Sequence, residues 1–260
     1  MKIKVIVAAH KPYQMPKDSV YMPLHVGKEG KKSIDFEGDN TGENISAKNG
    51  NYCELTGLYW AWKNLRDADV IGLVHYRRHF ASQENKRGKK WDRILTSKEM
   101  EKLMSEYDII VPCKRNYFIE TNETQYIHAH PKEDWDNMLS LVKEQYPEYS
   151  ASLDMMRKST SGHKFNMHIM KQKVLDNYCS WLFPLLEKIE EKQIEKSRIL
   201  GHISERMFDV WLYANEKKYK FKEIPIMFME NQNWLVKGAK FLGRKFRDSA
   251  FFRKNPKRQQ

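Results

Sequence analysis

Two adjacent arginines, Arg77 and Arg78, follow an apolar run of the kind that forms a buried strand. The segment Val70–Phe80 reads VIGLVHYRRHF, so an imidazole and a phenol stand directly before the guanidinium groups. Guanidinium groups bind phosphate oxygens in a bidentate manner and keep their charge at ordinary pH. The pair therefore predicts an anion site, provided that a turn begins here and brings both side chains to one ligand. The alternative is that one arginine pairs with a carboxylate and the other is solvated.

Polar or basic groups also follow two other predicted strands. His10 and Lys11 follow the apolar run of residues 2–9, and Cys113–Arg115 follow the run Tyr107–Pro112. In open α/β sheets, ligands bind beyond the carboxyl ends of the strands. We therefore expect three strand ends to present polar or basic groups at one edge of a sheet. The sequence has neither a Walker motif nor GxGxxG, so a bound nucleotide would not be held by a glycine-rich loop.

Two carboxylates are candidates for a general base, a group that must lie within hydrogen-bond reach of the hydroxyl it deprotonates. The segment GHISER supplies Glu205 near the start of a predicted helix, and HPKEDWD supplies Asp134. We favour Glu205. The alternative for Glu205 is a structural ion pair with Arg206 or Arg198.

The sequence does not favour a metal site. Asp67–Asp69 reads DAD, but it precedes its strand, whereas a metal-binding DxD normally lies at the far end, which HYRR occupies here. His128 and His130 precede three acidic residues, but histidines two positions apart in a loop are more often ordinary polar loop residues. The asparagines before residue 55 can cap, form turns or read a base or sugar through their amides. Glu54 lies in the first turn of the helix that follows, where the helix dipole favours an anion.

The elements that would position these groups alternate between strands and helices. Strand-like runs occupy residues 2–9, 69–74, 107–112, 165–170 and 221–228, and a long loop is expected between about residues 10 and 50. Helical periodicity begins near residues 51, 96, 135, 174 and 203, with capping-box spacing from Thr96 to Glu99 and with Pro184 expected to kink or split one long helix. This alternation predicts an α/β fold, a single domain with a mainly parallel sheet flanked by helices.

Charge separates the last part of the chain from the rest. Of the net charge of +12, residues 237–260 carry +8, from nine lysines and arginines against one aspartate, and phenylalanines are interleaved with them. We therefore expect a domain over residues 1–236 and a basic amphipathic tail over residues 237–260, suited to an anionic membrane surface. Three separated cysteines and no long apolar stretch predict a cytoplasmic protein, and the basic tail would place it at the inner face of the plasma membrane.

Five segments together resemble one known family. They are ENISAKNGNYCELTGLYWAWKN (Glu43–Asn64), IGLVHYRRHF (Ile71–Phe80), FNMHIM (Phe165–Met170), WLFPLLEKIE (Trp181–Glu190) and RILGHISERMFDVWL (Arg198–Leu212). With them the sequence resembles the bacterial capsular and exopolysaccharide glycosyltransferases long described only as a domain of unknown function, over residues 1 to about 230. The resemblance implies a GT-A-like fold and transfer of a sugar from a UDP-sugar donor. Some relatives look like galactofuranose transferases, and the acceptor implied is a lipid-linked oligosaccharide of surface polysaccharide synthesis.

The expected site combines these assignments. The catalytic residues are Glu205, Asp134, Arg77 and Arg78; the donor-binding residues are Ala9, His10, Asn44, Lys48, Asn51, Glu54, His75, Tyr76, Arg77 and Arg78; the acceptor-binding residues are His128, Asn166 and Met167. Positioned cations can stabilise a diphosphate leaving group as metal ions do in many enzymes. We therefore expect an inverting reaction with no cofactor and no metal.

Two other classes of function remain open from the sequence. A noncatalytic scaffold for polysaccharide assembly would keep the fold without the chemistry. A nucleic-acid-binding protein would use the basic tail together with stacking aromatic residues. The residues before the tail carry a net charge of only +4 and their aromatic residues lie on helical core stripes, so we expect no nucleic-acid partner.

Overall fold

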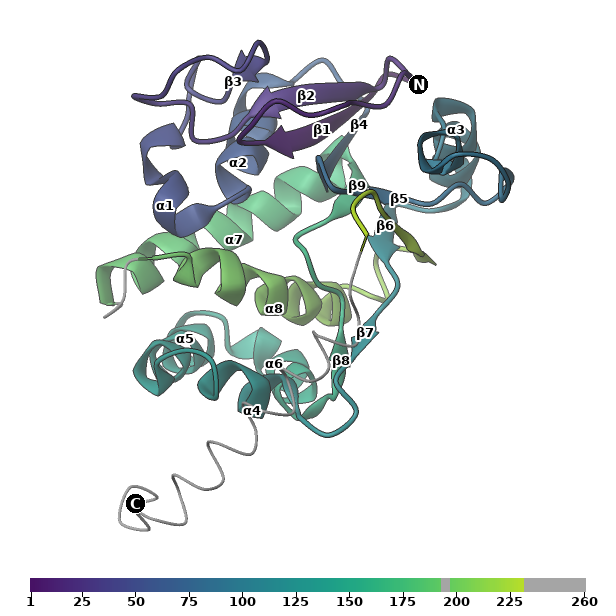
Figure 1. The fold of residues 1–260 in the computed structure, drawn as a ribbon. Coiled ribbons are helices and arrows are strands. Elements are labelled where there is room, and N and C mark those ends of the chain that lie inside the picture. Colours follow the sequence, from purple (N-terminus) through teal and green to yellow (C-terminus); the bar gives the residue numbers. More distant parts are fainter. Residues whose placement is uncertain (193–196, 232–260) are drawn as a thin grey trace.

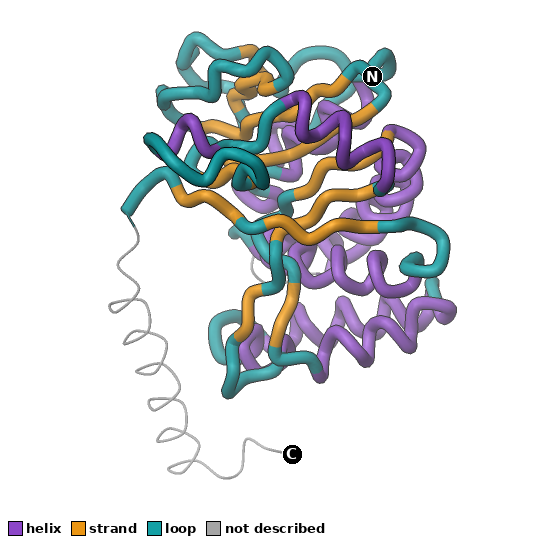
Figure 2. The backbone as a smooth tube through the Cα atoms, turned by 90° about the vertical axis from the view of Figure 1, so that its right-hand side faces the viewer, coloured by secondary structure: helices purple, strands orange, loops and turns teal. Residues whose placement is uncertain are grey.

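The computed structural model describes residues 1–192 and 197–231, and in it a mixed, mainly parallel sheet forms the centre of the protein (Figures 1 and 2). Across the sheet the strand order is β10, β6, β9, β4, β1, β2, β3. Along this path β9 is antiparallel to its neighbours, and the other strands share one direction. These strands are β1 (Ile3–Ala9), β2 (Tyr21–His25), β3 (Glu37–Gly38), β4 (Val70–His75), β6 (Ile109–Pro112), β9 (His168–Lys171) and β10 (Phe221–Ile224).

Four short strands extend from this sheet or lie beside it. β5 (Arg78–Phe80) runs antiparallel to both β4 and β11 (Ile226–Phe228). β7 (Arg115–Asn116) and β8 (Ser161–Gly162) form a separate antiparallel pair, which Figure 1 shows below the main sheet, near α6. The predicted tail of residues 237–260 lies outside the described residues.

Helices cover both faces of the sheet. They are α1 (Asn49–Tyr52), α2 (Leu55–Asn64), α3 (Ser97–Glu106), α4 (Asn122–Ile127), α5 (Lys132–Gln145), α6 (Ser150–Lys158), α7 (Gln172–Lys192) and α8 (Ile199–Ala214), with single 3₁₀ turns at Ser46–Lys48, Lys90–Arg93 and Pro147–Tyr149. No helix within the described residues combines the length and the apolar content needed to cross a bilayer.

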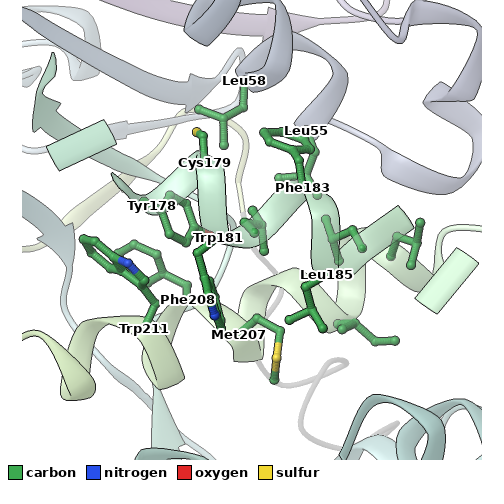
Figure 3. Close-up of a cluster of buried hydrophobic side chains, with 14 of the residues drawn as sticks. Leu55, Leu58, Tyr178, Cys179, Trp181, Phe183, Leu185, Met207, Phe208 and Trp211 are labelled. Carbon is green, nitrogen blue, oxygen red and sulfur yellow. The ribbon is translucent and has the colours of Figure 1, made fainter. Parts of the chain in front are cut away.

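The apolar runs are continuous because alternate residues of each strand are buried on opposite faces. From β1, Ile6 and Ala8 enter the core built with α2, α7 and α8, whereas Val5 and Val7 enter a second core that contains Met100 and Met104 of α3. Figure 3 shows the first core, in which the helices α2, α7 and α8 contribute Leu55, Leu58, Tyr178, Cys179, Phe183, Met207, Phe208 and Trp211.

Most of the predicted elements are present. The capping box is confirmed: the Thr96 side chain accepts a hydrogen bond from the Glu99 amide at 3.3 Å, and the Glu99 carboxylate accepts one from the Thr96 amide at 3.0 Å. The predicted split at Pro184 is wrong, because α7 continues through it. Pro184 is exposed between buried neighbours, so its ring lies on the outer face of the helix.

The expected long loop after β1 contains two strands. β2 pairs in parallel with β1, and β3 pairs with β2. Pro23 stands inside β2, opposite Val7, and a proline within a short run is a signal against a strand. The expected strand at residues 165–170 begins only at His168, because Phe165 and Asn166 adopt left-handed backbone conformations with φ of 78° and 50°.

Candidate active site

A tight turn at the end of β4 keeps both predicted arginines at the carboxyl edge of the sheet. β4 ends at His75 and β5 begins at Arg78, and these two residues pair with each other, so Tyr76 and Arg77 form the turn. The Arg77 side chain is 40% exposed and lies 3.3 Å from Glu230. The Arg78 guanidinium lies 4.6 Å from the centre of the Phe165 ring. The turn required for a shared anion site is therefore present.

Positive charge is concentrated around the end of β1. The His10 ring packs edge-on against Tyr76 at 5.2 Å, and the Lys11 ammonium lies 5.6 Å from the centre of the same Tyr76 ring. Partial burial lowers the pKa of the His10 imidazole, and four positive side chains lower it further: Arg77, Lys11, Lys31 and Arg198. Their combined field makes this edge attractive to an anion such as a diphosphate.

Two carboxylates face this cationic edge. Glu54 immediately precedes α2, and Glu205 lies on the second turn of α8. Burial lowers the pKa of the Arg78 guanidinium, and so does the charge of Arg77, while the charges of Glu54 and Glu205 oppose that shift. The Glu54 side chain is only 17% exposed and the Glu205 side chain only 19%. The site therefore places acidic groups beside arginines at the carboxyl edge of the sheet.

The strained pair Phe165 and Asn166 holds both carboxylates. The Phe165 amide donates a hydrogen bond to Glu205 Oε1 at 3.1 Å. The Asn166 Nδ2 group donates to Glu54 Oε1 at 2.8 Å and to the Gly201 carbonyl at 3.1 Å, while Asn166 Oδ1 accepts from Ser204 at 3.0 Å. Left-handed non-glycine residues cost about 1–3 kcal/mol each and persist where the surroundings over-determine them. The hydrogen bonds of Phe165 and Asn166 stabilise these left-handed conformations.

His75 links the turn to the same strained pair. Its Nε2 atom lies 2.5 Å from the Phe165 carbonyl oxygen and 3.9 Å from Glu54 Oε1. A carbonyl oxygen can only accept, so Nε2 carries the proton. Burial lowers the pKa of His75, the charge of Glu54 opposes this, and the charge of Arg78 adds to it. A neutral imidazole that donates from Nε2 therefore fastens β4 to the segment before β9.

A buried lysine lies directly behind this segment. Lys164 is 3% exposed, and its ammonium nitrogen lies 2.7 Å from Asn122 Oδ1 and 5.7 Å from the centre of the Tyr117 ring. Burial lowers the pKa of Lys164 to about 7, with a further contribution from Arg206. The preceding residue is also anchored, since His163 Nδ1 lies 2.5 Å from Asp209 Oδ1. The two side chains directly before Phe165 and Asn166 are thus anchored.

Arg198 belongs to the site, although the sequence suggested it only as an ion-pair partner of Glu205. It directly precedes α8 in a left-handed conformation with φ of 61°, and its amide donates to the Gly50 carbonyl at 3.0 Å. Its charge acts on His10, Cys53 and His202. The sequence predicted the start of this helix only near residue 203, and the approach of Arg198 to His10 depends on the packing of α8 against α1.

Eight of the predicted site residues converge at this edge: His10, Glu54, His75, Tyr76, Arg77, Arg78, Asn166 and Glu205. Ala9 precedes His10, and its carbonyl accepts from the Val26 amide. Asn51 lies beneath the start of α8, where its Oδ1 accepts from the Leu200 amide at 3.4 Å. Asn44 caps its own turn, and Lys48 forms an ion pair with Glu190 of α7 at 2.7 Å.

The other predicted residues lie in different surroundings. Met167 is 1% exposed within the second core, so its side chain offers no surface to an acceptor. Asp134 is fully buried in the first turn of α5, whereas the Glu205 side chain is 19% exposed. His128 Nδ1 lies 2.6 Å from Glu120. At the third strand end, the Lys114 ammonium lies 5.3 Å from the centre of the Tyr213 ring. The described residues contain no group of three or more His, Cys, Asp or Glu side chains that could hold a metal ion.

Comparison with solved structures gives one strong match, to a protein described as the WbbM bifunctional glycosyltransferase in its apo form. The match has 29% sequence identity and a TM-score of 0.81, and it covers 89% of this chain and 46% of WbbM. This chain therefore spans about half the length of that protein, and the mainly parallel sheet flanked by helices matches a glycosyltransferase fold, as the sequence predicted. Comparison with curated proteins found no match. Residues 4–217 match the family described as Domain of unknown function (DUF4422), and the chain belongs to that family.

Proposed function

We propose that this protein is a glycosyltransferase that moves a sugar from a nucleotide diphosphate donor, a UDP-sugar, to a hydroxyl acceptor. The observation that carries the proposal is the meeting of Arg77, Arg78 and Arg198 with Glu54 and Glu205 at the carboxyl edge of the sheet. The likeness to a protein described as a bifunctional glycosyltransferase supports the same reaction class.

The arginines suit the leaving group. A departing nucleoside diphosphate gains negative charge as the glycosidic bond breaks, and fixed cations near it lower the barrier. Arg77 is accessible, Arg78 is held against Phe165, and Arg198 approaches from α8, so cations reach the ligand position from separate elements. Since such cations can replace a divalent ion, we expect turnover to persist in excess EDTA, and a strict manganese requirement would contradict this part of the proposal.

Glu205 suits the base of an inverting transfer. Its Oε1 atom accepts from the Phe165 amide, and its Oε2 atom lies 3.4 Å from an Arg206 nitrogen, so the carboxylate is held in place but keeps 19% of its surface. A base in a fixed position can take the acceptor proton as the new bond forms. In this proposal Glu54, held by Asn166 and close to His75, faces the donor.

The donor sugar, the acceptor, the extent of the catalytic domain and the membrane segment are proposed in the same way. UDP-galactofuranose is the donor to test first, with a lipid-linked oligosaccharide of bacterial surface polysaccharide synthesis as acceptor. Residues 1–236 would form the catalytic domain. The basic segment 237–260 would hold the protein at the cytoplasmic face of the plasma membrane. Sedimentation with anionic vesicles, comparing the full chain with one that ends at Val236, tests the role of that segment; equal binding would remove it.

Donor binding is tested by thermal unfolding with a panel of nucleotides and nucleotide sugars. A ligand at a hundred times its Kd should stabilise the folded state by about 2.7 kcal/mol. We expect UDP and one or more UDP-sugars to raise the melting temperature, with loss of the effect in Arg77→Ala. No stabilisation by any nucleoside diphosphate would contradict the proposal. Stabilisation without donor hydrolysis or transfer would instead indicate a noncatalytic scaffold.

A further inference from the structure

We infer that the tip of the β7–β8 ribbon, Tyr117–Ile119, inserts into the interfacial layer of an anionic lipid bilayer. The tip follows β7 and is tied back to the segment leading into β8, because the Tyr117 amide donates to the Thr160 carbonyl at 2.8 Å. Figure 1 shows the ribbon near α6, away from the edge that carries β3. The insertion itself does not depend on glycosyl transfer.

The tip exposes adjacent large apolar side chains. Phe118 is 81% exposed and Ile119 is 50% exposed. Among the described residues, the other large apolar side chains with comparable exposure are Met1 and Met155, which stand singly. Single exposed apolar residues are ordinary on protein surfaces. Phe118 and Ile119 are adjacent, so together they form one contiguous apolar patch at the end of the ribbon.

The backbone fixes Phe118 in this outward position. Its φ is 57°, a left-handed conformation that is unusual for a bulky residue. The Phe118 amide donates to Asn116 Oδ1 at 2.7 Å, and the Ile119 amide donates to the Tyr117 carbonyl at 2.6 Å. The turn is therefore held by its own hydrogen bonds, and the aromatic ring remains exposed instead of folding back onto the protein.

The charges next to the tip specify the partner. Lys114 and Arg115 are exposed, and the Arg115 guanidinium lies 5.6 Å from the centre of the Tyr117 ring. Residues 113–119 and 157–164 contain no acidic side chain, and the nearest acid along the chain, Glu120, is 6% exposed and bonded to His128. Apolar side chains flanked by basic ones suit the boundary between acyl chains and anionic headgroups.

The tip is connected to the candidate active site. Tyr117 lies 5.7 Å from the buried Lys164 ammonium, and the residue after Lys164 is Phe165, which binds Glu205. A bilayer in contact with the tip would therefore lie close to the proposed base. If the proposed function is correct, this arrangement presents an acceptor that is itself held in the membrane.

A fluorescent probe at residue 118 tests insertion directly, whatever other part of the chain also binds lipid. Phe118→Cys is labelled with an environment-sensitive fluorophore in the full chain carrying Cys113→Ser, because Cys113 is exposed. The matched control is Met155→Cys, since Met155 is 57% exposed on α6. Vesicles are made of phosphatidylcholine alone or of phosphatidylcholine with an equal part of phosphatidylglycerol, with and without brominated acyl chains.

We expect the probe at residue 118 to shift to shorter wavelength and to be quenched by bromine on the anionic vesicles, and the probe at residue 155 to do neither. In sedimentation, the variant Phe118→Asn with Ile119→Ser should partition at least about tenfold more weakly than the wild type, and Met155→Ser should not. Asparagine suits the left-handed position, so this variant keeps the turn.

An unshifted probe at residue 118, equal responses of both probes, or equal partitioning of the double variant and the wild type would each overturn the inference. Donor hydrolysis without vesicles separates this result from a failure of the proposed function. Neither substitution touches the arginines or the carboxylates of the site, so hydrolysis by the double variant should match that of the wild type.

Discussion

Glu54 and Glu205 are held by adjacent residues of one strained segment. Asn166 donates to Glu54 at 2.8 Å through its side chain, and Phe165 donates to Glu205 at 3.1 Å through its backbone. Glu54 immediately precedes α2 and Glu205 lies on α8, so the short segment before β9 sets the positions of the two carboxylates relative to each other. Any change in this segment should affect both carboxylates together.

Replacing an arginine of the site should remove most turnover without unfolding the protein. We expect Arg77→Ala, Arg78→Ala and Arg198→Ala each to lower kcat/KM by about 10²–10³, the usual loss when one charge-stabilising contact of a transition state is removed. The assay is transfer or hydrolysis of the donor found in the nucleotide panel.

The matched control for these variants is Arg66→Ala. Arg66 is 59% exposed, pairs with Asp176 and precedes β4, at the opposite edge of the sheet from the site. Its loss should leave kcat/KM unchanged. Normal turnover in Arg77→Ala or Arg78→Ala, with the control equally active, would show that this arginine is structural or solvated.

Asn166→Asp should destabilise the protein more strongly at high pH than at low pH. The substitution places a carboxylate oxygen where an amide now donates to Glu54, so like charges would meet in a partly buried site. One of the two carboxyl groups would then have a folded-state pKa above its ordinary value, and stability would be lost as the pH rises through that pKa. We expect a loss of about 2–4 kcal/mol at pH 8 and a smaller loss at pH 5, by urea unfolding.

Asn166→Gly serves as the control for this substitution. Glycine accepts φ of 50° and removes the side chain without adding a charge. Its unfolding free energy should also fall, but by an amount that does not depend on pH. The same pH dependence in both variants would show that charge repulsion at Glu54 is not the cause.

Gly201→Ala should loosen the contact between α8 and the turn that precedes α2. A methyl group at residue 201 would stand 2.9 Å from the Cys53 sulfur and 3.1 Å from the Cys53 Cβ. Overpacking typically costs about 1–3 kcal/mol, against about 1 kcal/mol gained from the better helix former. We therefore expect a net loss of up to about 2 kcal/mol in the free energy of unfolding.

Cys53→Gly should restore much of that stability. It removes both clashing atoms and suits the φ of 53° at that position. In a double-mutant cycle the coupling energy should exceed about 0.5 kcal/mol. The control is Gly50→Ala, where a methyl group meets nothing within 4 Å and should not destabilise. Strict additivity of the substitutions at residues 53 and 201 would contradict the proposed contact.

Buried histidines should make the protein sensitive to acid. Complete burial lowers the pKa of His168 to about 3, so the unfolded chain takes up the proton first. Stability from this group is fully present above its ordinary pKa of about 6.5 and is lost as the pH falls below that value. The expected slope is about 1 kcal/mol per pH unit for this residue. His168→Leu should show a correspondingly shallower decline between pH 6 and pH 4, and an unchanged slope would rule His168 out as a contributor.

The sequence by itself determined the elements whose signals are local. Runs such as Ile3–Ala9 and Val70–His75 form strands because almost every side chain is apolar and both faces of the sheet are covered. The capping box at Thr96 needs only residues within one helical turn. The rule that ligands bind beyond strand ends was enough to place His10, His75 and both adjacent arginines at one edge.

Only the tertiary structure decided how that edge is completed. The contacts of Asn166 with Glu54, and of Phe165 with Glu205, join residues far apart in the sequence, and no local pattern encodes such pairs. The left-handed conformations of Phe165, Asn166 and Arg198 are unfavourable in isolation, so only the surrounding hydrogen bonds stabilise them. β2 was missed for a related reason: its pairing with β1 outweighs the local signal of Pro23. Contacts between distant segments supply the free energy that these local preferences oppose.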